Sequence, residues 1–516
     1  MTIDRALPLT ETAVAFLARF SAELDAHGWR AAARIIEDHW DRLALTEPQA
    51  LLDAFTALPA EGFIETPSWL IEVDYLRYIS SRAAPRAFRR GFNPAADTPS
   101  SDLSLRDRLF GITSRVAEYR SAGRVSDAVA AATEARRVLD DAESTERAGL
   151  RMSLPHLSIH WAQALDVGDS PLAAGEYEET CIAAVATDQL RVARRAAASL
   201  AWLHAEQGRI HDARQWLDRA TGFDVAIDRY EVPLLLAQTL IALDSLDTEG
   251  ARRHLQNADR FIAGEYWAAS LWLHALLSTS PEEIIITETL MTRETRRHVS
   301  MAVEPGAHRR QVALASWALR ARRGTLASPD ASSEGVSSAI GAETAYRLGR
   351  FSEAHAIVSR LSHDELHPRL RGAVLLVDAA SNLRLGKQDQ AVEVFRRAHD
   401  LIHTEGLSML FATIDAHALR ELAEASHLSV DSAVLQFLHT STDDPRPAIP
   451  RLSRRERQVL ALLASGLSNN EMAERLFITV NTLKSTVRNL YRKLGAKDRA
   501  EASDLAHRLG LDDGTD

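Results

Sequence analysis

The segment "SNNEMAERLFITVNTLKSTVRNLYRKLG" at residues 468–495 decides the fold of the C-terminal part of the chain. If residues 480–494 form one helix, four apolar side chains fall on one face at i, i+4, i+7 and i+11, namely Leu483, Val487, Leu490 and Leu494. The opposite face carries Asn481, Lys484, Ser485, Arg488 and Arg492, with no carboxylate among them. A helix with one apolar face and one face of amides, hydroxyls and cations is typical of contact with a polyanion.

Capping residues divide residues 451–516 into helices. Three capping boxes, Ser453/Glu456, Ser468/Glu471 and Asp498/Glu501, mark helix starts, Thr479 caps a fourth start, and Gly466, Gly495 and Gly510 mark helix ends. The pattern predicts helices at 454–465, 469–476, 480–494 and 499–509. The turn "FIT" at 477–479 makes the second and third a helix-turn-helix. We expect the apolar stripe to pack on Val459, Leu463, Met472 and Leu476.

The outward stripe is suited to the major groove of DNA, which admits one α-helix. Lys484 and Arg488 can reach guanine edges, and Asn481 and Ser485 can bond to bases or phosphates. We assign phosphate contacts to Asn469, Asn470, Thr479, Thr482, Thr486, Arg492, Lys493, Lys497 and Arg499. The alternative for this segment is a charged four-helix module that binds a protein.

The same residues carry a family resemblance. The motifs "RERQVL", "ASGLSNNEMAERLFI", "TLK", "YRKLGAKDRAEA" and "LGL" resemble the LuxR-type (GerE-like) DNA-binding domain. The resemblance implies base contacts by Lys484, Ser485 and Arg488. It also implies dimerisation through the fourth helix, by the face with Ala502, Leu505, Ala506 and Leu509. The family usually has His where this chain has Thr486, which puts one phosphate contact and the preferred operator in doubt.

The rest of the chain repeats one layout. A Gly at a helix end is followed five residues later by a small Ala in the next helix, in the pairs Gly123/Ala128, Gly168/Ala173, Gly208/Ala213, Gly349/Ala354 and Gly386/Ala391. Ala251 fits the layout without a Gly, and region 259–340 has no clean copy. We interpret the Gly as a left-handed helix terminator and the Ala as the close contact of a helical hairpin. The pattern predicts stacked repeats of the tetratricopeptide (TPR) type.

We therefore predict an all-α chain: a helical arm at 1–82, a TPR-like superhelix at 103–425, a linker at 440–450 and the helix-turn-helix domain at 451–516. The linker "TSTDDPRPAIP" has three prolines in six residues, which cannot continue a helix. The charge is divided in the same way. Residues 451–511 contain 12 Lys and Arg against six Asp and Glu, whereas the first 450 residues carry a net charge of −14.

The body also resembles the helical-repeat sensor of the large regulators related to the maltose-operon activator. Two segments show this resemblance. Residues 16–59 resemble the helical arm that follows the ATPase in those regulators, and residues 396–412 resemble their last repeats. A Walker A loop and the strand pattern of a receiver domain are absent from the sequence. The resemblance implies a chain with the sensor and DNA-binding parts but without the nucleotide switch.

Three groups in the body allow a ligand interpretation beside a structural one. Trp161, Trp202, Trp216, Trp267, Trp272 and Trp317 can line a pocket, although Trp at this spacing favours inter-repeat core. His156 and His160 have metal-ligand spacing without an identifiable third ligand. Cys181 is predicted to be buried, with redox sensing as the alternative.

We predict a transcription regulator that is not an enzyme and needs no cofactor or metal. Its expected partners are double-stranded DNA, a small-molecule or protein effector at the repeats, RNA polymerase and a second copy of the chain on DNA. The sequence has no membrane-length apolar run and its N-terminus lacks a signal-peptide layout, so we expect a bacterial cytoplasmic protein that joins the nucleoid when bound to DNA. The alternative is a repeat scaffold that binds proteins, with DNA contact secondary.

Overall fold

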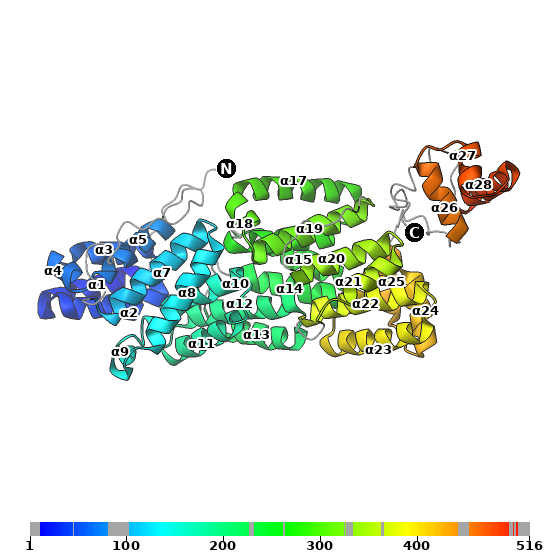
Figure 1. Cartoon of the computed structure of the whole chain (residues 1–516). Coiled ribbons are helices and arrows are strands. Elements are labelled where there is room, and N and C mark those ends of the chain that lie inside the picture. The colour runs from blue at the N-terminus through cyan, green and yellow to red at the C-terminus, as the bar shows by residue number, and fades with distance from the viewer. Residues whose placement is uncertain are drawn as a thin grey trace. The chain divides into compact units, whose positions relative to one another are not determined.

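Figure 1 shows the computed structural model of the chain, which describes residues 11–44, 46–80, 103–225, 232–261, 264–324, 326, 334–362, 366–441, 454–494, 499 and 502–503. Every regular element in these ranges is a helix, which confirms the predicted all-α class. The chain divides into two compact units, one of residues up to 241, 249–273 and 289–312, and one of residues 242–248, 274–288 and from 313 onward. None of the helices in the described ranges is long and apolar enough to cross a membrane.

In its described residues, the N-terminal arm is a bundle of five helices. They are α1 (Glu11–His27), α2 (Trp29–Leu43), α3 (Pro48–Ala57), α4 (Ala60–Glu65) and α5 (Ser68–Ser80). Their apolar faces share one core in which Phe16, Phe20 and Phe55 are almost fully buried. Trp69 meets the rings of Trp29 and Phe55 edge to face, a favourable arrangement for aromatic pairs.

Helical hairpins follow the arm in the first unit. Their helices are α7 (Leu105–Ser121), α8 (Val125–Asp140), α9 (Ser144–Gly149), α10 (Leu154–Val167), α11 (Ala173–Ala186), α12 (Leu190–Gln207) and α13 (Ile210–Gly222). Three hairpins are formed by the pairs α7 and α8, α10 and α11, and α12 and α13. Helix α10 also contacts α8 and α12 of the neighbouring hairpins. One continuous core results, with Trp161, Tyr177 and Ala196 among its fully buried residues. This arrangement confirms the predicted bihelical repeats.

Connecting helices lie between the clear repeats. They are α14 (Val232–Asp244), α15 (Thr248–Ala258), the 3-10 turn η1 (Gly264–Tyr266), α16 (Trp267–Leu277), α17 (Pro281–Arg297), α18 (Val299–Val303) and α19 (Ala307–Arg323). Within the first unit, Arg310 of α19 binds Asp169 at 2.7 Å and Glu206 at 2.8 Å. This ion-pair cluster fixes α19 to the ends of α10 and α12, which explains how a region without the repeat spacing stays attached to the stack.

The second unit repeats the hairpin. Its helices are α20 (Glu334–Arg347), α21 (Phe351–Val358), α22 (Pro368–Arg384), α23 (Gln388–Glu405), η3 (Ser408–Thr413), α24 (Ala416–Ser426) and α25 (Ser432–Ser441). Arg369 of α22 holds the fully buried carboxylate of Asp244 with two bonds, of 2.9 and 2.6 Å. A bidentate guanidinium–carboxylate pair of this kind satisfies both buried charges at once.

The turns between paired helices share one hydrogen bond, which sequence reasoning did not specify. A backbone N–H bonds to the carbonyl five residues earlier, at Arg124, Ser170, Arg209, Asp247, Arg350 and Lys387, over 2.8 to 2.9 Å. The residue before each donor has a positive φ, as the Schellman motif requires. Gly occupies that position at 123, 208, 349 and 386, as predicted, and the paired Ala128, Ala213, Ala354 and Ala391 are buried.

The prediction for Gly168 was wrong. Gly168 has φ −82°, and the left-handed residue of that turn is Asp169, with φ 54°. Gly168 is required for another reason, since a Cβ there would lie 2.3 Å from Cγ2 of Val129. In the turn before Ala251, Leu246 adopts the left-handed conformation that Gly has elsewhere, with φ 64°. Both turns keep the motif without Gly because its hydrogen bond outweighs the cost of a left-handed side chain.

The C-terminal domain contains α26 (Arg454–Ala464), α27 (Asn469–Arg475) and α28 (Val480–Leu494). Most of the predicted fourth helix at 499–509 and most of the predicted linker at 440–450 lie outside the described residues, and α25 continues to Ser441.

Candidate nucleic-acid interface

The helix-turn-helix is held by its own small core. Leu483 and Leu490 of α28 are fully buried, and Val487 is partly buried. They share a core with Val459 and Leu463 of α26 and with Met472 and Leu476 at α27, as the sequence predicted. The side chain of Leu494 lies outside the described residues. Burial of this stripe fixes which side of α28 faces outward.

Capping bonds set where the two helices begin. The Ser468 hydroxyl accepts the N–H of Glu471 at 3.4 Å, and the Glu471 carboxylate accepts the N–H of Ser468 at 2.7 Å, which completes the predicted capping box. These bonds hold the pKa of Glu471 below its usual range. Thr479 caps α28 as predicted, because its hydroxyl accepts the N–H of Thr482 at 3.2 Å.

The outward side of α28 matches the predicted base-reading set. Asn481, Lys484, Ser485 and Arg488 are all exposed, and so are Thr482 and the cap Thr479. Ser485 and Thr486 donate their hydroxyl hydrogens to the Thr482 carbonyl, at 2.8 and 2.9 Å. Each hydroxyl oxygen can therefore still accept a hydrogen bond from another group. At the start of α27, Asn469 and Asn470 are exposed beside the capped amides. One face thus combines two cations with polar side chains at two helix N-termini.

Two residues predicted to make contacts, Arg499 and Ala502, have other roles in the domain, and six more cannot be placed on this face. Arg499 donates to the backbone carbonyls of Leu463 and Leu467, which gives it a structural role that the sequence did not reveal. Ala502 is fully buried in the core of the domain, which leaves it no surface for a dimer contact. The side chains of Arg492, Lys493, Lys497, Leu505, Ala506 and Leu509 lie outside the described residues.

Two residues of this domain were missed by sequence reasoning. Arg455 donates to the Leu476 carbonyl and so ties α26 to the end of α27. Phe477 occupies the left-handed position of the turn, with φ 53°, and is 96% exposed. The bond from Ile478 N–H to the Ala473 carbonyl at 3.0 Å is the same bond that closes the repeat hairpins, so the predicted "FIT" turn has the geometry of the Schellman motif.

Comparison with known proteins identifies this module. Residues 450–506 match the family model described as bacterial regulatory proteins, luxR family. The C-terminal domain is a LuxR-type helix-turn-helix domain. The predicted resemblance is therefore confirmed, and it covers a small part of the chain.

Curated relatives match over longer stretches. Transcriptional regulatory protein LiaR of Bacillus subtilis is 32% identical over 122 residues, which are 22% of this chain and 57% of LiaR. HTH-type transcriptional regulator MalT of Yersinia pestis is 31% identical over 198 residues, which are 31% of this chain and 21% of MalT. MalT of Yersinia pseudotuberculosis matches to the same extent.

The match to MalT is longer than the LuxR-type domain, so the similarity continues into the helical region ahead of it, as the second resemblance implied. The chain spans just over half the length of LiaR and about a fifth of the length of MalT. No solved structure matches the chain.

The candidates in the body separate into core and cavity residues. Trp161, Trp202, Trp267 and Trp272 are buried, as the core interpretation predicted, and Cys181 is also buried. Trp216 packs on the core from a partly buried position. No group of three His, Cys, Asp or Glu side chains in the described part of the chain is placed to hold a metal ion. His156 and His160 line a cavity.

Proposed function

We propose that the chain is a DNA-binding transcription regulator whose C-terminal domain reads an operator and whose helical body senses an effector. The observation that carries the proposal is α28, which buries Leu483 and Leu490 and exposes Lys484 and Arg488 on the other side. The match of this domain to the LuxR-family model supports the assignment. The similarity to LiaR and MalT, which are both named as transcriptional regulators, supports it as well.

In the proposed complex, α28 lies in the major groove. Lys484 and Arg488 donate to guanine edges, and Asn481 and Ser485 contact bases or adjacent phosphates. The exposed N-terminal ends of α27 and α28, with Asn469, Asn470, Thr479 and Thr482, face phosphate oxygens, because amides at helix starts attract anions. The phosphate roles of Thr486, Arg492, Lys493 and Lys497 remain part of the proposal.

The regulatory part of the proposal concerns the body. A small molecule or protein bound there changes how two copies of the chain present their domains, so that two recognition helices fit half-sites about one helical turn apart. RNA polymerase is then the partner that converts occupancy into a change in transcription. This scheme places the regulator in the cytoplasm and makes no use of catalysis.

Selection of binding sites from random DNA tests the proposal. Full-length protein and the fragment 446–516 are each equilibrated with a random duplex library at physiological salt, and bound sequences are read out. We expect both to enrich one palindromic motif. Enrichment of no motif by either protein would contradict the proposal and favour a scaffold that binds proteins.

A further inference from the structure

A cavity of about 120 Å³ lies in the first unit, between the arm and the first repeats. Helices α2, α5, α7, α10 and α12 all contribute side chains to its wall. Much of the wall is apolar or aromatic, including Trp40, Tyr75 and Phe110. Cavities of comparable volume, about 150 Å³, hold one benzene ring when engineered into a protein. The space therefore suits a ligand built on a single ring.

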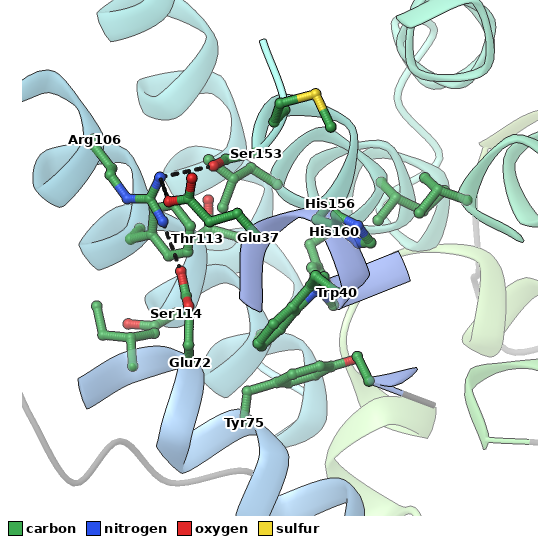
Figure 2. Close-up of a pocket in the computed structure, with 18 of the residues that line it drawn as sticks. Glu37, Trp40, Glu72, Tyr75, Arg106, Thr113, Ser114, Ser153, His156 and His160 are labelled. Carbon is green, nitrogen blue, oxygen red and sulfur yellow. Dashed lines mark hydrogen bonds and ion pairs between the residues drawn. The ribbon is translucent and has the colours of Figure 1, made fainter. Parts of the chain in front are cut away.

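One end of the cavity is closed by an ion-pair cluster in which one guanidinium faces two carboxyl groups, and burial raises the pKa of one of them, Glu72, to about 7. Arg106 binds Glu37 and Glu72 at 3.0 Å each and donates to the Ser153 hydroxyl at 3.1 Å. Figure 2 shows this group on one side of the site, with His156, His160, Trp40 and Tyr75 on the other. Glu37 and Glu72 are the acidic side chains among the described residues of the wall, and both are on Arg106.

The opposite end has positive charge and neutral rings. Arg191 and Arg195 of α12 both line the cavity. The charge of Arg195 acts on His156 and His160, and its guanidinium donates to the amide oxygen of Gln163 at 2.7 Å. Burial, followed by the charge of Arg195, lowers the pKa of His156 to about 3. Burial and the charges of Arg120 and Arg195 hold the pKa of His160 well below its usual range. The two imidazoles are thus uncharged at neutral pH, and the nearby arginines make the electrostatic potential around them positive.

The edges of the two imidazoles are oriented by their neighbours. The Arg120 guanidinium donates to Nδ1 of His160 at 3.2 Å, while the rings of Trp40 and Tyr75 stand perpendicular to His156 and His160. His156 and His160 keep part of their surface accessible. A ligand in this space meets aromatic faces along its length and cationic side chains at one end.

We propose that this cavity binds a small carboxylate on a single aromatic ring, with the ring between Trp40 and Tyr75 and the carboxylate beside Arg195. A guanidinium favours carboxylates, and a wall with Trp40, Tyr75 and Phe110 offers aromatic contacts to a flat ring. This inference rests on the proposed sensing role of the body, because such a ligand would be its effector. The assignment gives His156 and His160 a place in the wall of a ligand site. Among the described residues, no third side chain is placed to complete a metal site with them.

Calorimetric titration of the full-length chain tests the assignment with three probes of one shape: benzoate, benzamide and benzylamine. We expect benzoate to bind with a dissociation constant below about 1 mM, within the range open to a ligand of nine heavy atoms. Benzamide should bind at least about tenfold more weakly, since it lacks the charge. Benzylamine should not bind measurably. Absence of benzoate binding, or equal binding of benzylamine, would overturn the inference.

Matched variants locate the binding. Arg195→Met should weaken benzoate binding about tenfold or more, whereas Arg194→Met, one residue along the same helix and outside the cavity wall, should leave it unchanged. Ala117→Leu fills the cavity without changing its charge and should abolish binding. Benzoate affinity that survives both Arg195→Met and Ala117→Leu would place the site elsewhere and contradict the assignment.

A separate DNA titration keeps the two proposals distinguishable. If benzoate does not bind while the full chain still binds its selected motif, the cavity assignment alone fails. If benzoate binds as expected but the affinity for the motif is the same with and without it, the cavity is a binding site and the sensing role fails.

Discussion

At the scale of single residues, Phe477 is the most unusual position of the DNA-binding domain. Its backbone is left-handed, and its ring is almost fully exposed in the turn between α27 and α28. A left-handed conformation costs a residue with a side chain about 1–2 kcal/mol, a cost that glycine avoids. The turn therefore carries strain that burial of the ring does not offset.

Phe477→Gly should raise the free energy of unfolding of the domain by about 0.5–1 kcal/mol, since relief of strain exceeds the extra chain entropy of glycine. Urea unfolding of the fragment 446–516 measures the change. The control Glu474→Gly, at an exposed position inside α27, should lower the same free energy by about 1 kcal/mol. A loss of stability in Phe477→Gly would show that the ring makes a contact the turn depends on.

Asp166 is a buried carboxyl of the body whose ionisation makes stability depend on pH. Burial, and then the negative charge of Glu206, raise its pKa to about 8, although the Tyr177 hydroxyl donates to it at 3.1 Å. The carboxyl is thus protonated in the folded state up to about pH 8, whereas in the unfolded chain it ionises near its ordinary value of 3.8. Its contribution to stability is complete below pH 3.8 and is lost as the pH rises through 8.

Asp166→Asn should remove this loss. The unfolding free energy of the variant relative to the native chain is expected to rise by about 2 kcal/mol from pH 6 to pH 8. Scanning calorimetry of the full-length chain at several pH values measures the difference. The control Tyr177→Phe keeps the carboxyl, so its unfolding free energy should fall with pH as in the native chain. An unfolding free energy that does not change with pH in Tyr177→Phe would contradict the explanation. So would one that falls in Asp166→Asn as steeply as in the native chain.

At the scale of elements, the hairpin turns show what sequence can and cannot predict. The Gly-to-Ala spacing identified the repeats because a left-handed residue and a close helix contact each restrict which side chain fits. It assigned the left-handed position wrongly at Gly168 and named none before Ala251, since the backbone bond of the motif tolerates Asp169 and Leu246 there. Burial of the apolar stripe likewise predicted the exposed face of α28, whereas the carbonyl contacts of Arg455 and Arg499 depend on tertiary geometry and left no local pattern.

Gly386→Ala isolates the backbone requirement of one hairpin. A Cβ at this position meets nothing within 4 Å, so the φ of 78° is the single source of cost. We expect a loss of about 1 kcal/mol in the unfolding free energy, measured by calorimetry. Gly175→Ala, in an open position inside α11, should instead gain up to about 1 kcal/mol. Equal changes of the unfolding free energy in the two variants would contradict the claim that the left-handed backbone of Gly386 requires glycine.

At the scale of the whole molecule, an acidic helical body is followed in the sequence by a basic DNA-binding domain. The first 450 residues carry a net charge of −14, and residues 451–511 carry +6. No sequence pattern indicates the cavity in the first unit, because its wall comes from five helices that are distant along the chain. The i, i+4 spacing of His156 and His160 is that of metal ligands, and only the folded arrangement relates the two residues to the arm.

The charge separation predicts that the body weakens DNA binding. The fragment 446–516 should bind random duplex DNA more tightly than the full-length chain at low salt, and the difference should shrink as salt screens the acidic body. Fluorescence anisotropy at several salt concentrations measures both affinities. A fragment that binds no tighter than the whole chain at equal salt would exclude this inhibitory effect.

The most direct test of the central claim measures sequence discrimination by α28 in the full-length chain. Equilibrium titrations compare the selected motif with a scrambled duplex for the native protein, Lys484→Ala and Arg488→Ala, with Glu474→Ala as an exposed control on α27. We predict that each of the first two variants loses about 1–3 kcal/mol on the motif and much less on scrambled DNA, so that discrimination falls, while the control keeps it. Equal losses on both duplexes would contradict the claim that α28 reads the bases.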